Sequence, residues 1–190
     1  YYGHPEAERV IVSMGSACCA IEEAVDGMNA KGEKVGLVTV RLFRPFVAEK
    51  MLAALPSTVT RIAVLDRTKE PGADAPLYLE VRNALYGRPD APIVVGGRYG
   101  LASKEFSPAH AASVFENLNA DSPRNDFSVG IEDDVTHMSL PPVPAASLTR
   151  DTHNLACKSW GFGSAGTVGA NKSAIKVIGD ATDHCFQGYF

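Results

Sequence analysis

The residues best suited to chemistry form a glycine-rich run near the C-terminus. The run combines glycines, hydroxyl side chains, an amide and a cation: Gly163, Ser164, Gly166, Thr167, Gly169, Asn171 and Lys172. Glycines let the backbone approach a ligand closely, and backbone amides with hydroxyls and a lysine suit a phosphate group. The run lacks the Gly-Lys-Ser/Thr of a Walker loop. Two interpretations therefore stay open, contact with a phosphate-bearing ligand and a structural turn.

Three other segments carry polar residues at turns. Residues 15–17 (Gly-Ser-Ala) form either a phosphate cradle at a helix N-terminus or a plain tight turn. Residues 66–72 form either a ligand contact at the carboxyl edge of a sheet or a mixed-charge solvated loop. Residues 132–134 (Glu-Asp-Asp) with His137 could hold a hard cation, although adjacent acids on an irregular segment are typical of a solvated turn.

Cysteine content and charge exclude several classes of protein. The four cysteines, Cys18, Cys19, Cys157 and Cys185, include no C-x-x-C pair, so we expect no metal site in this chain. A net charge of -4 without a basic stripe argues against nucleic acid as a partner. No signal peptide and no apolar run of about 18 residues is present, so we expect no membrane contact. The few cysteines favour a reducing compartment, the cytoplasm or an organelle matrix.

Apolar runs alternate with segments of helical period along the first part of the chain. The runs at residues 10–14, 35–40, 61–66, 93–97 and 127–131 predict strands. Helices are predicted after Ser16 as N-cap, after Pro45, from about Pro76 and from Ser107-Pro108, and Gly32 suits a left-handed helix end. Strands that alternate with helices predict an α/β fold, a doubly wound mostly parallel sheet.

The alternation stops after Ile131, and Pro-Pro-Val-Pro follows at residues 141–144. Because such a sequence favours an extended polyproline conformation, we expect a domain over residues 1–140 and a linker over 141–157. Residues 158–190 then form the incomplete start of a second α/β domain, with a helix that ends near Ile175. The chain opens on Tyr1 without Met and closes on an uncapped β-prone run, so we expect an internal fragment of a longer protein.

Six strings of residues, in one order along the chain, resemble the pyruvate:ferredoxin (flavodoxin) oxidoreductases. These strings are residues 2–12, 40–46, 63–72, 96–101, 133–137 and 160–172. The resemblance implies that residues 1–140 are similar to the C-terminal domain of transketolases. It also implies that residues 158–190 open the domain that corresponds to the gamma subunit of multi-subunit 2-oxoacid oxidoreductases.

The resemblance further implies an activity for the full-length enzyme. That family oxidatively decarboxylates pyruvate with thiamine diphosphate, forms acetyl-CoA and CO2, and passes electrons through iron-sulphur clusters to ferredoxin or flavodoxin, usually as a homodimer. The thiamine-binding and cluster-binding residues of that family map to no position of this chain, so we assign no catalytic residue and no metal ligand. We therefore expect the isolated chain to be inactive and to bind no cofactor alone. The gamma-type domain is associated with CoA in that family, which favours CoA contact at Gly163, Ser164, Gly166, Thr167, Gly169, Asn171 and Lys172. Ser159 and Ala165 depart from the usual aromatic and acidic residues there.

Alternative functions stay open at this point. A pyruvate:NADP oxidoreductase would carry the same core and differ only in sequence beyond this chain. A non-catalytic α/β interaction module would use the sheet for association alone. A free-standing dinucleotide-binding protein is disfavoured because no complete Gly-x-Gly-x-x-Gly follows the first strand.

Overall fold

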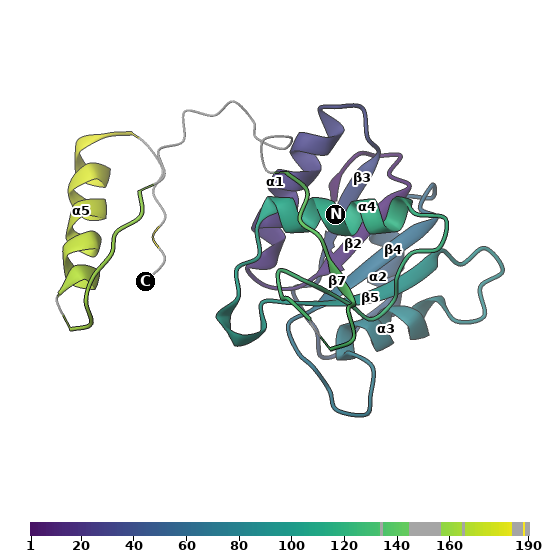
Figure 1. Cartoon of the computed structure of the whole chain (residues 1–190). Coiled ribbons are helices and arrows are strands. Elements are labelled where there is room, and N and C mark those ends of the chain that lie inside the picture. The colour runs from purple at the N-terminus through teal and green to yellow at the C-terminus, as the bar shows by residue number, and fades with distance from the viewer. Residues whose placement is uncertain (134, 145–156, 165, 184–187, 189–190) are drawn as a thin grey trace. The chain divides into compact units, whose positions relative to one another are not determined.

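A computed structural model describes residues 1–133, 135–144, 157–164, 166–183 and 188. The chain divides into two compact units, residues 1–151 and residues 152–190. In the described residues, the first unit contains the sheet and four α-helices, and the second contains one helix with the loop before it (Figure 1).

The first unit is built on a seven-stranded sheet with the order β1-β3-β2-β4-β5-β6-β7. β1 pairs antiparallel with β3, and every other neighbouring pair is parallel. The strands are β1 (Tyr2–Gly3), β2 (Arg9–Ser13), β3 (Val35–Thr39), β4 (Arg61–Asp66), β5 (Ile93–Tyr99), β6 (Phe127–Val129) and β7 (Ser139–Leu140). Because β3 and β4 lie on opposite sides of β2, the strand order reverses at β2.

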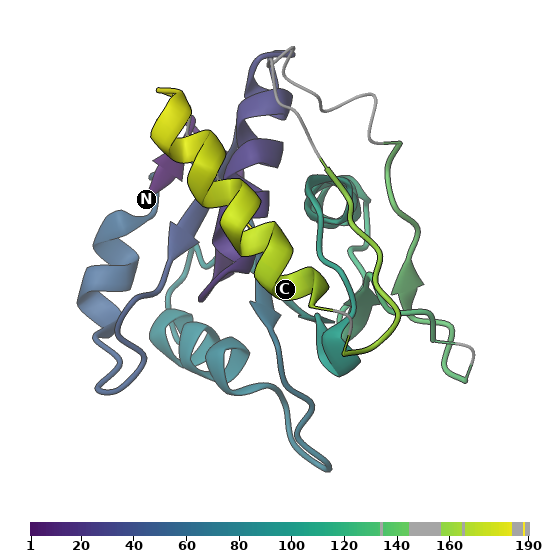
Figure 2. The ribbon, with the colours of Figure 1, turned by 90° about the vertical axis from the view of Figure 1, so that its left-hand side faces the viewer.

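Four α-helices cover the two faces of this sheet (Figures 1 and 2). α1 (Ala17–Asn29) and α4 (Pro108–Asn119) pack on one face, and α2 (Ala48–Ala54) and α3 (Pro76–Leu85) pack on the other. β2 shows how the sequence achieves this, because Ile11 joins the core under α1 and α4 while Val10 and Val12 join the core under α2 and α3. All three side chains are fully buried. The predicted doubly wound, mostly parallel α/β fold is confirmed.

The local signals for helix ends are confirmed in part. Gly32 adopts the left-handed conformation after α1, with a φ of 87°. Ser107 precedes α4, and its backbone N–H donates to Nδ1 of His110 over 3.1 Å. Ser16 occupies the predicted N-cap position of α1, but it has helical φ and ψ angles and its hydroxyl makes no capping hydrogen bond, so only the position is confirmed. A hydroxyl caps a helix from an extended backbone, which Ser16 lacks.

Three short elements were not predicted. β1 and β7 have two residues each, and a 3-10 helix, η1 (Leu101–Ser103), has three. Segments this short contain too few residues to show a period, so only their pairing with neighbouring strands defines them. Within the expected linker, Val143 N–H donates to the Ala109 carbonyl over 3.4 Å, and its side chain packs against the core under α4.

The described part of the second unit is dominated by α5 (Thr167–Ala181). The helix has 15 residues and none of them is buried. It therefore continues well past Ile175, where the sequence placed its end. The β-branched residues in this stretch are Ile175, Val177 and Ile178. Such residues favour a strand, but a helix accommodates them at a small cost in free energy.

Candidate functional site

The glycine-rich run forms a loop that enters the N-terminus of α5. Gly163 and Gly166 have φ angles of 47° and 73°, in the left-handed region that residues with a side chain rarely adopt. Gly166 is the residue that precedes the helix, so its positive φ angle sets the direction in which the chain enters α5. Backbone geometry therefore favours glycine at these two positions, whether or not a ligand binds.

Part of this run packs on itself. A Cβ atom at Gly161 would overlap the hydroxyl of Thr167, so the loop backbone lies directly against the first turn of α5. One turn further along, the Ser159 hydroxyl donates to Oδ1 of Asn171 over 2.9 Å. Thr167 and Asn171 are therefore turned toward the preceding loop, where they hold it against the helix.

The remainder of the run is open. A Cβ atom at Gly163, Gly166 or Gly169 would meet nothing within 4 Å, and Ser164 and Lys172 are exposed. Lys172 lies about 7.5 Å along the helix axis from Thr167, the first helical residue, since each helical residue rises 1.5 Å. No acidic side chain occupies the first turn of α5. An anion could thus approach the free helix N-terminus from the glycine side, with Lys172 as a neighbour.

At the turn after β4, the Asp66 carboxylate forms its hydrogen bonds within the fold. Asp66 is only 2% exposed, and its two carboxylate oxygens accept hydrogen bonds from Leu77 N–H over 3.0 Å and Tyr78 N–H over 3.1 Å. Burial raises the pKa of Asp66, and the two amide donors act in the opposite direction. Asp66 thus caps α3 from a neighbouring strand, and Arg67 donates from Nε to the Gly100 carbonyl over 3.1 Å.

The two other predicted turns are also accounted for by local geometry. Gly15 has a φ angle of 72° and leads directly into α1, as a tight turn requires. The Asp133 carboxylate accepts hydrogen bonds from the backbone N–H groups of Val135 and Thr136 over 3.1 and 2.9 Å. A hydrogen bond from the Thr136 hydroxyl, together with these backbone bonds, holds the pKa of Asp133 below its ordinary value. Asp134 lies outside the described residues.

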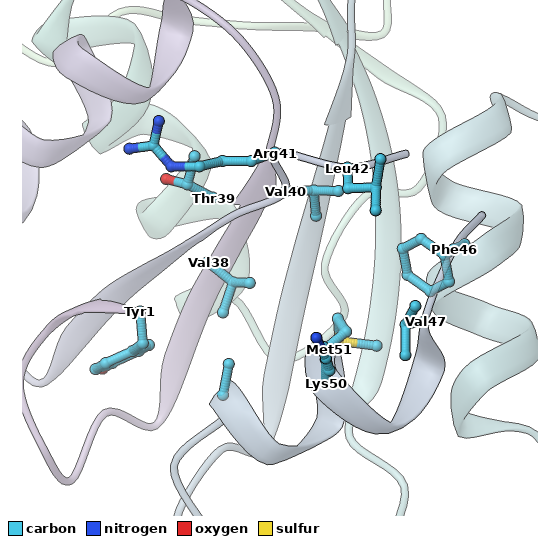
Figure 3. Close-up of a pocket in the computed structure, with 11 residues that line it drawn as sticks. Tyr1, Val38, Thr39, Val40, Arg41, Leu42, Phe46, Val47, Lys50 and Met51 are labelled. Carbon is cyan, nitrogen blue, oxygen red and sulfur yellow. The ribbon is translucent and has the colours of Figure 1, made fainter. Parts of the chain in front are cut away.

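An apolar groove that the sequence did not predict lies beside α2, with a volume of about 250 Å³. We call it the α2 groove; the end of β3, the connection to α2 and α2 itself line it, with Tyr1, Val38, Thr39, Val40, Arg41, Leu42, Phe46, Val47, Lys50, Met51 and Ala54 (Figure 3). A signal was present in the connection after β3, where Leu42, Phe46 and Val47 are apolar in a stretch too short for a buried element.

Of the cysteines described, Cys18 is buried, whereas Cys19 and Cys157 are exposed, and all three are free. Among the described residues, no three His, Cys, Asp or Glu side chains lie together as metal ligands would. None of the described helices is long and apolar enough to cross a membrane.

The sheet order and the two helical layers define an open, doubly wound α/β domain, and comparison with known proteins identifies its family. The family described as pyruvate:ferredoxin oxidoreductase core domain II matches residues 7–111. This chain belongs to that family. The match covers β2 to the start of α4, which is the centre of the sheet and its covering helices.

Curated relatives match beyond that domain, over 100% of this chain. The pyruvate:ferredoxin oxidoreductase of Moorella thermoacetica is 58% identical over 191 residues. The pyruvate-flavodoxin oxidoreductases of Klebsiella pneumoniae and Enterobacter agglomerans are 56% and 54% identical over 191 residues. The chain spans 16% of the length of each of these relatives. Among solved structures, the 2-oxoglutarate:ferredoxin oxidoreductase of Magnetococcus marinus is similar with a TM-score of 0.39 and 20% identity, over 57% of this chain and 17% of that chain.

Proposed function

We propose that this chain is part of an enzyme that oxidatively decarboxylates pyruvate in the presence of CoA and transfers the electrons to ferredoxin or flavodoxin. The observation that carries the proposal is the 54–58% identity to pyruvate oxidoreductases over 100% of the chain. The products would be acetyl-CoA, CO2 and the reduced electron carrier. We place the enzyme in the cytoplasm or an organelle matrix, as a homodimer.

Within that enzyme, the first unit serves as a packing domain. Among the described residues of this unit, Asp66 is the one deeply buried carboxylate, and its hydrogen bonds to the N-terminus of α3 leave it unavailable to a substrate. Thiamine diphosphate supplies the stabilised carbanion on which decarboxylation depends, and iron-sulphur clusters accept the electrons. The described residues offer no ligand set for a cluster, so we assign the clusters to other parts of the enzyme. We assign thiamine diphosphate there too, because the thiamine-binding residues of the family map to no position of this chain.

The second unit contributes contact with CoA. The open side of the loop supports this assignment because, among the described residues, a Cβ atom at Gly163, Gly166 or Gly169 would meet nothing within 4 Å. Ser164 would donate a hydroxyl, and Lys172 would add a charge-assisted contact. Thr167 and Asn171, which face the preceding loop, would position its backbone and would not bind CoA themselves. The same proposal assigns residues 141–157 to a linker and residues 158–190 to the start of a gamma-type domain.

The test compares Lys172→Ala with Lys176→Ala in the oxidoreductase that contains this chain. Both lysines are exposed on α5 and lie one turn apart, so either substitution removes one positive charge from the same helix. Lys172→Ala should raise the KM for CoA about 5- to 150-fold, which corresponds to loss of a contact to a charged group, and should leave the KM for pyruvate unchanged. Lys176→Ala should change neither constant. If the two variants have the same KM for CoA, the loop has a structural role and does not contact CoA.

A separate measurement tests the activity itself. Pyruvate- and CoA-dependent reduction of ferredoxin or flavodoxin should be measured with the purified oxidoreductase. Reduction that requires both substrates is the expected result. Reduction with another 2-oxoacid but not with pyruvate would refute the proposed substrate while leaving the reaction class intact.

A further inference from the structure

The α2 groove exposes apolar side chains that the fold does not use. Leu42 is 61% exposed and Val47 is 36% exposed, and both lie at the mouth of the groove. The floor consists of buried residues, Val38 from β3 and Met51 from α2 (Figure 3). An apolar surface that leads from a buried floor to exposed side chains is typical of a contact site for another polypeptide.

The charges around the groove are of one sign. Arg41 and Lys50 line it, and no acidic residue does. Among the described residues, neither cation forms an ion pair with a carboxylate, whereas nearby Arg44 is paired with Glu80 over 2.9 Å. Figure 3 shows the Lys50 nitrogen beside Met51, whereas the Arg41 side chain extends past Thr39, away from Leu42 and Phe46. An occupant that brings an acidic group to Lys50 would complement this lining.

The exposed positions also indicate the size of the occupant. The groove is open and has a volume of about 250 Å³, and its lining residues Leu42 and Val47 are 61% and 36% exposed, so a small molecule in it would cover only part of their surface. A polypeptide segment would fill the groove with one side chain and cover the mouth with its neighbours. In contacts of this kind, most of the binding free energy comes from a buried apolar anchor that a polar rim surrounds.

We propose that the α2 groove binds a polypeptide segment that carries a large apolar side chain next to an acidic residue. The segment comes from the part of the oxidoreductase outside this chain, and this origin rests on the proposed function. The matched relatives supply such a source, since this chain corresponds to only 16% of their length. The groove is then a contact through which the first unit is fixed to another domain.

The experiment measures binding of the purified chain to overlapping peptides that cover the remainder of the Moorella thermoacetica relative. Two groove variants, Val47→Asp and Lys50→Glu, are compared with Ile93→Asp and Lys69→Glu as controls. Ile93 is 50% exposed and Lys69 is exposed, and neither lines the groove. Circular dichroism of each variant should match that of the wild type, because all four side chains are at the surface.

We expect one or a few neighbouring peptides to bind, each with an acidic residue beside a large apolar one. Val47→Asp and Lys50→Glu should each weaken that binding about tenfold or more, as loss of an anchor or reversal of a paired charge does, and the controls should leave it unchanged. Absence of any bound peptide, or equal weakening by groove and control variants, would overturn the proposal.

A small ligand is the rival occupant, and anilinonaphthalene sulfonate serves as its probe. If this apolar anion binds in a Lys50-dependent manner while no peptide binds, the groove is a small-molecule site and the proposal fails. The pyruvate assay keeps the two proposals apart. Pyruvate activity without peptide binding refutes only the groove contact, whereas peptide binding without pyruvate activity refutes only the proposed reaction.

Discussion

Asp66 shows how a single buried side chain stabilises a helix that it does not belong to. The Asp66→Ala variant should lose about 1–3 kcal/mol in free energy of unfolding, since the amides of Leu77 and Tyr78 would lose their acceptors. Asp66→Asn retains one side-chain oxygen as acceptor and should lose less. Urea unfolding of both variants at one pH provides the measurement. A loss for Asp66→Ala no larger than for Asp66→Asn would contradict this role.

The same residue predicts a pH dependence. Because burial raises the pKa of Asp66 in the folded state, the folded protein binds this proton more tightly than the unfolded chain does. Stability from this group is therefore present below the unfolded pKa of about 4 and declines as the pH rises through the higher folded pKa. Relative to Asp66→Asn, the wild type should lose free energy of unfolding across that window. Parallel pH profiles for the two proteins would contradict the prediction.

At the scale of elements, two glycines differ in their surroundings: one lies where packing leaves no room for a side chain, and the other lies where a side chain would meet no other atom. A Cβ atom at Gly97 of β5 would overlap the ring of Phe127 on β6, a fully buried side chain. Gly97→Ala should therefore lower the free energy of unfolding of the first unit by about 1–3 kcal/mol, the usual cost of overpacking a core. Thermal unfolding followed by circular dichroism would measure this loss.

Gly169→Ala is the matched control, because a Cβ atom there would meet nothing within 4 Å and the residue lies inside α5. Replacing a helical glycine by alanine favours the helix by about 1 kcal/mol. The variant should gain helical signal and leave unfolding of the first unit unchanged. Destabilisation by Gly169→Ala equal to that by Gly97→Ala would show that the difference in packing has no effect.

At the scale of the whole molecule, the purified 190-residue chain should not oxidise pyruvate. The reason is that a reaction of this kind needs a carbanion-stabilising cofactor and an electron acceptor held close together, and we assign both to other parts of the enzyme. Pyruvate-dependent dye reduction and bound iron should both equal the buffer control. Iron bound in proportion to protein, or dye reduction that depends on pyruvate, would refute the assignment.

The sequence by itself determined the fold class and most of the elements. Strands such as 61–66 and helices such as the one from Pro76 were predictable because burial on both faces of a parallel sheet requires continuous apolar runs, and helical packing requires a period of 3.6 residues. These are local properties of the chain. The glycines at 163 and 166 could likewise be recognised as turn residues, although the choice of CoA as their ligand comes from family resemblance.

Only the tertiary structure decided the roles of particular polar and apolar side chains. Asp66 could be recognised as a residue at a strand end, but its bonds to Leu77 and Tyr78 depend on how α3 packs beside β4. The α2 groove likewise depends on Val38, Leu42 and Met51 meeting from three segments. Such contacts join residues that are separated along the chain, so no local pattern encodes them. The physical reason is that periodicity records which face of an element is buried, whereas a cap or a groove depends on which other element covers that face.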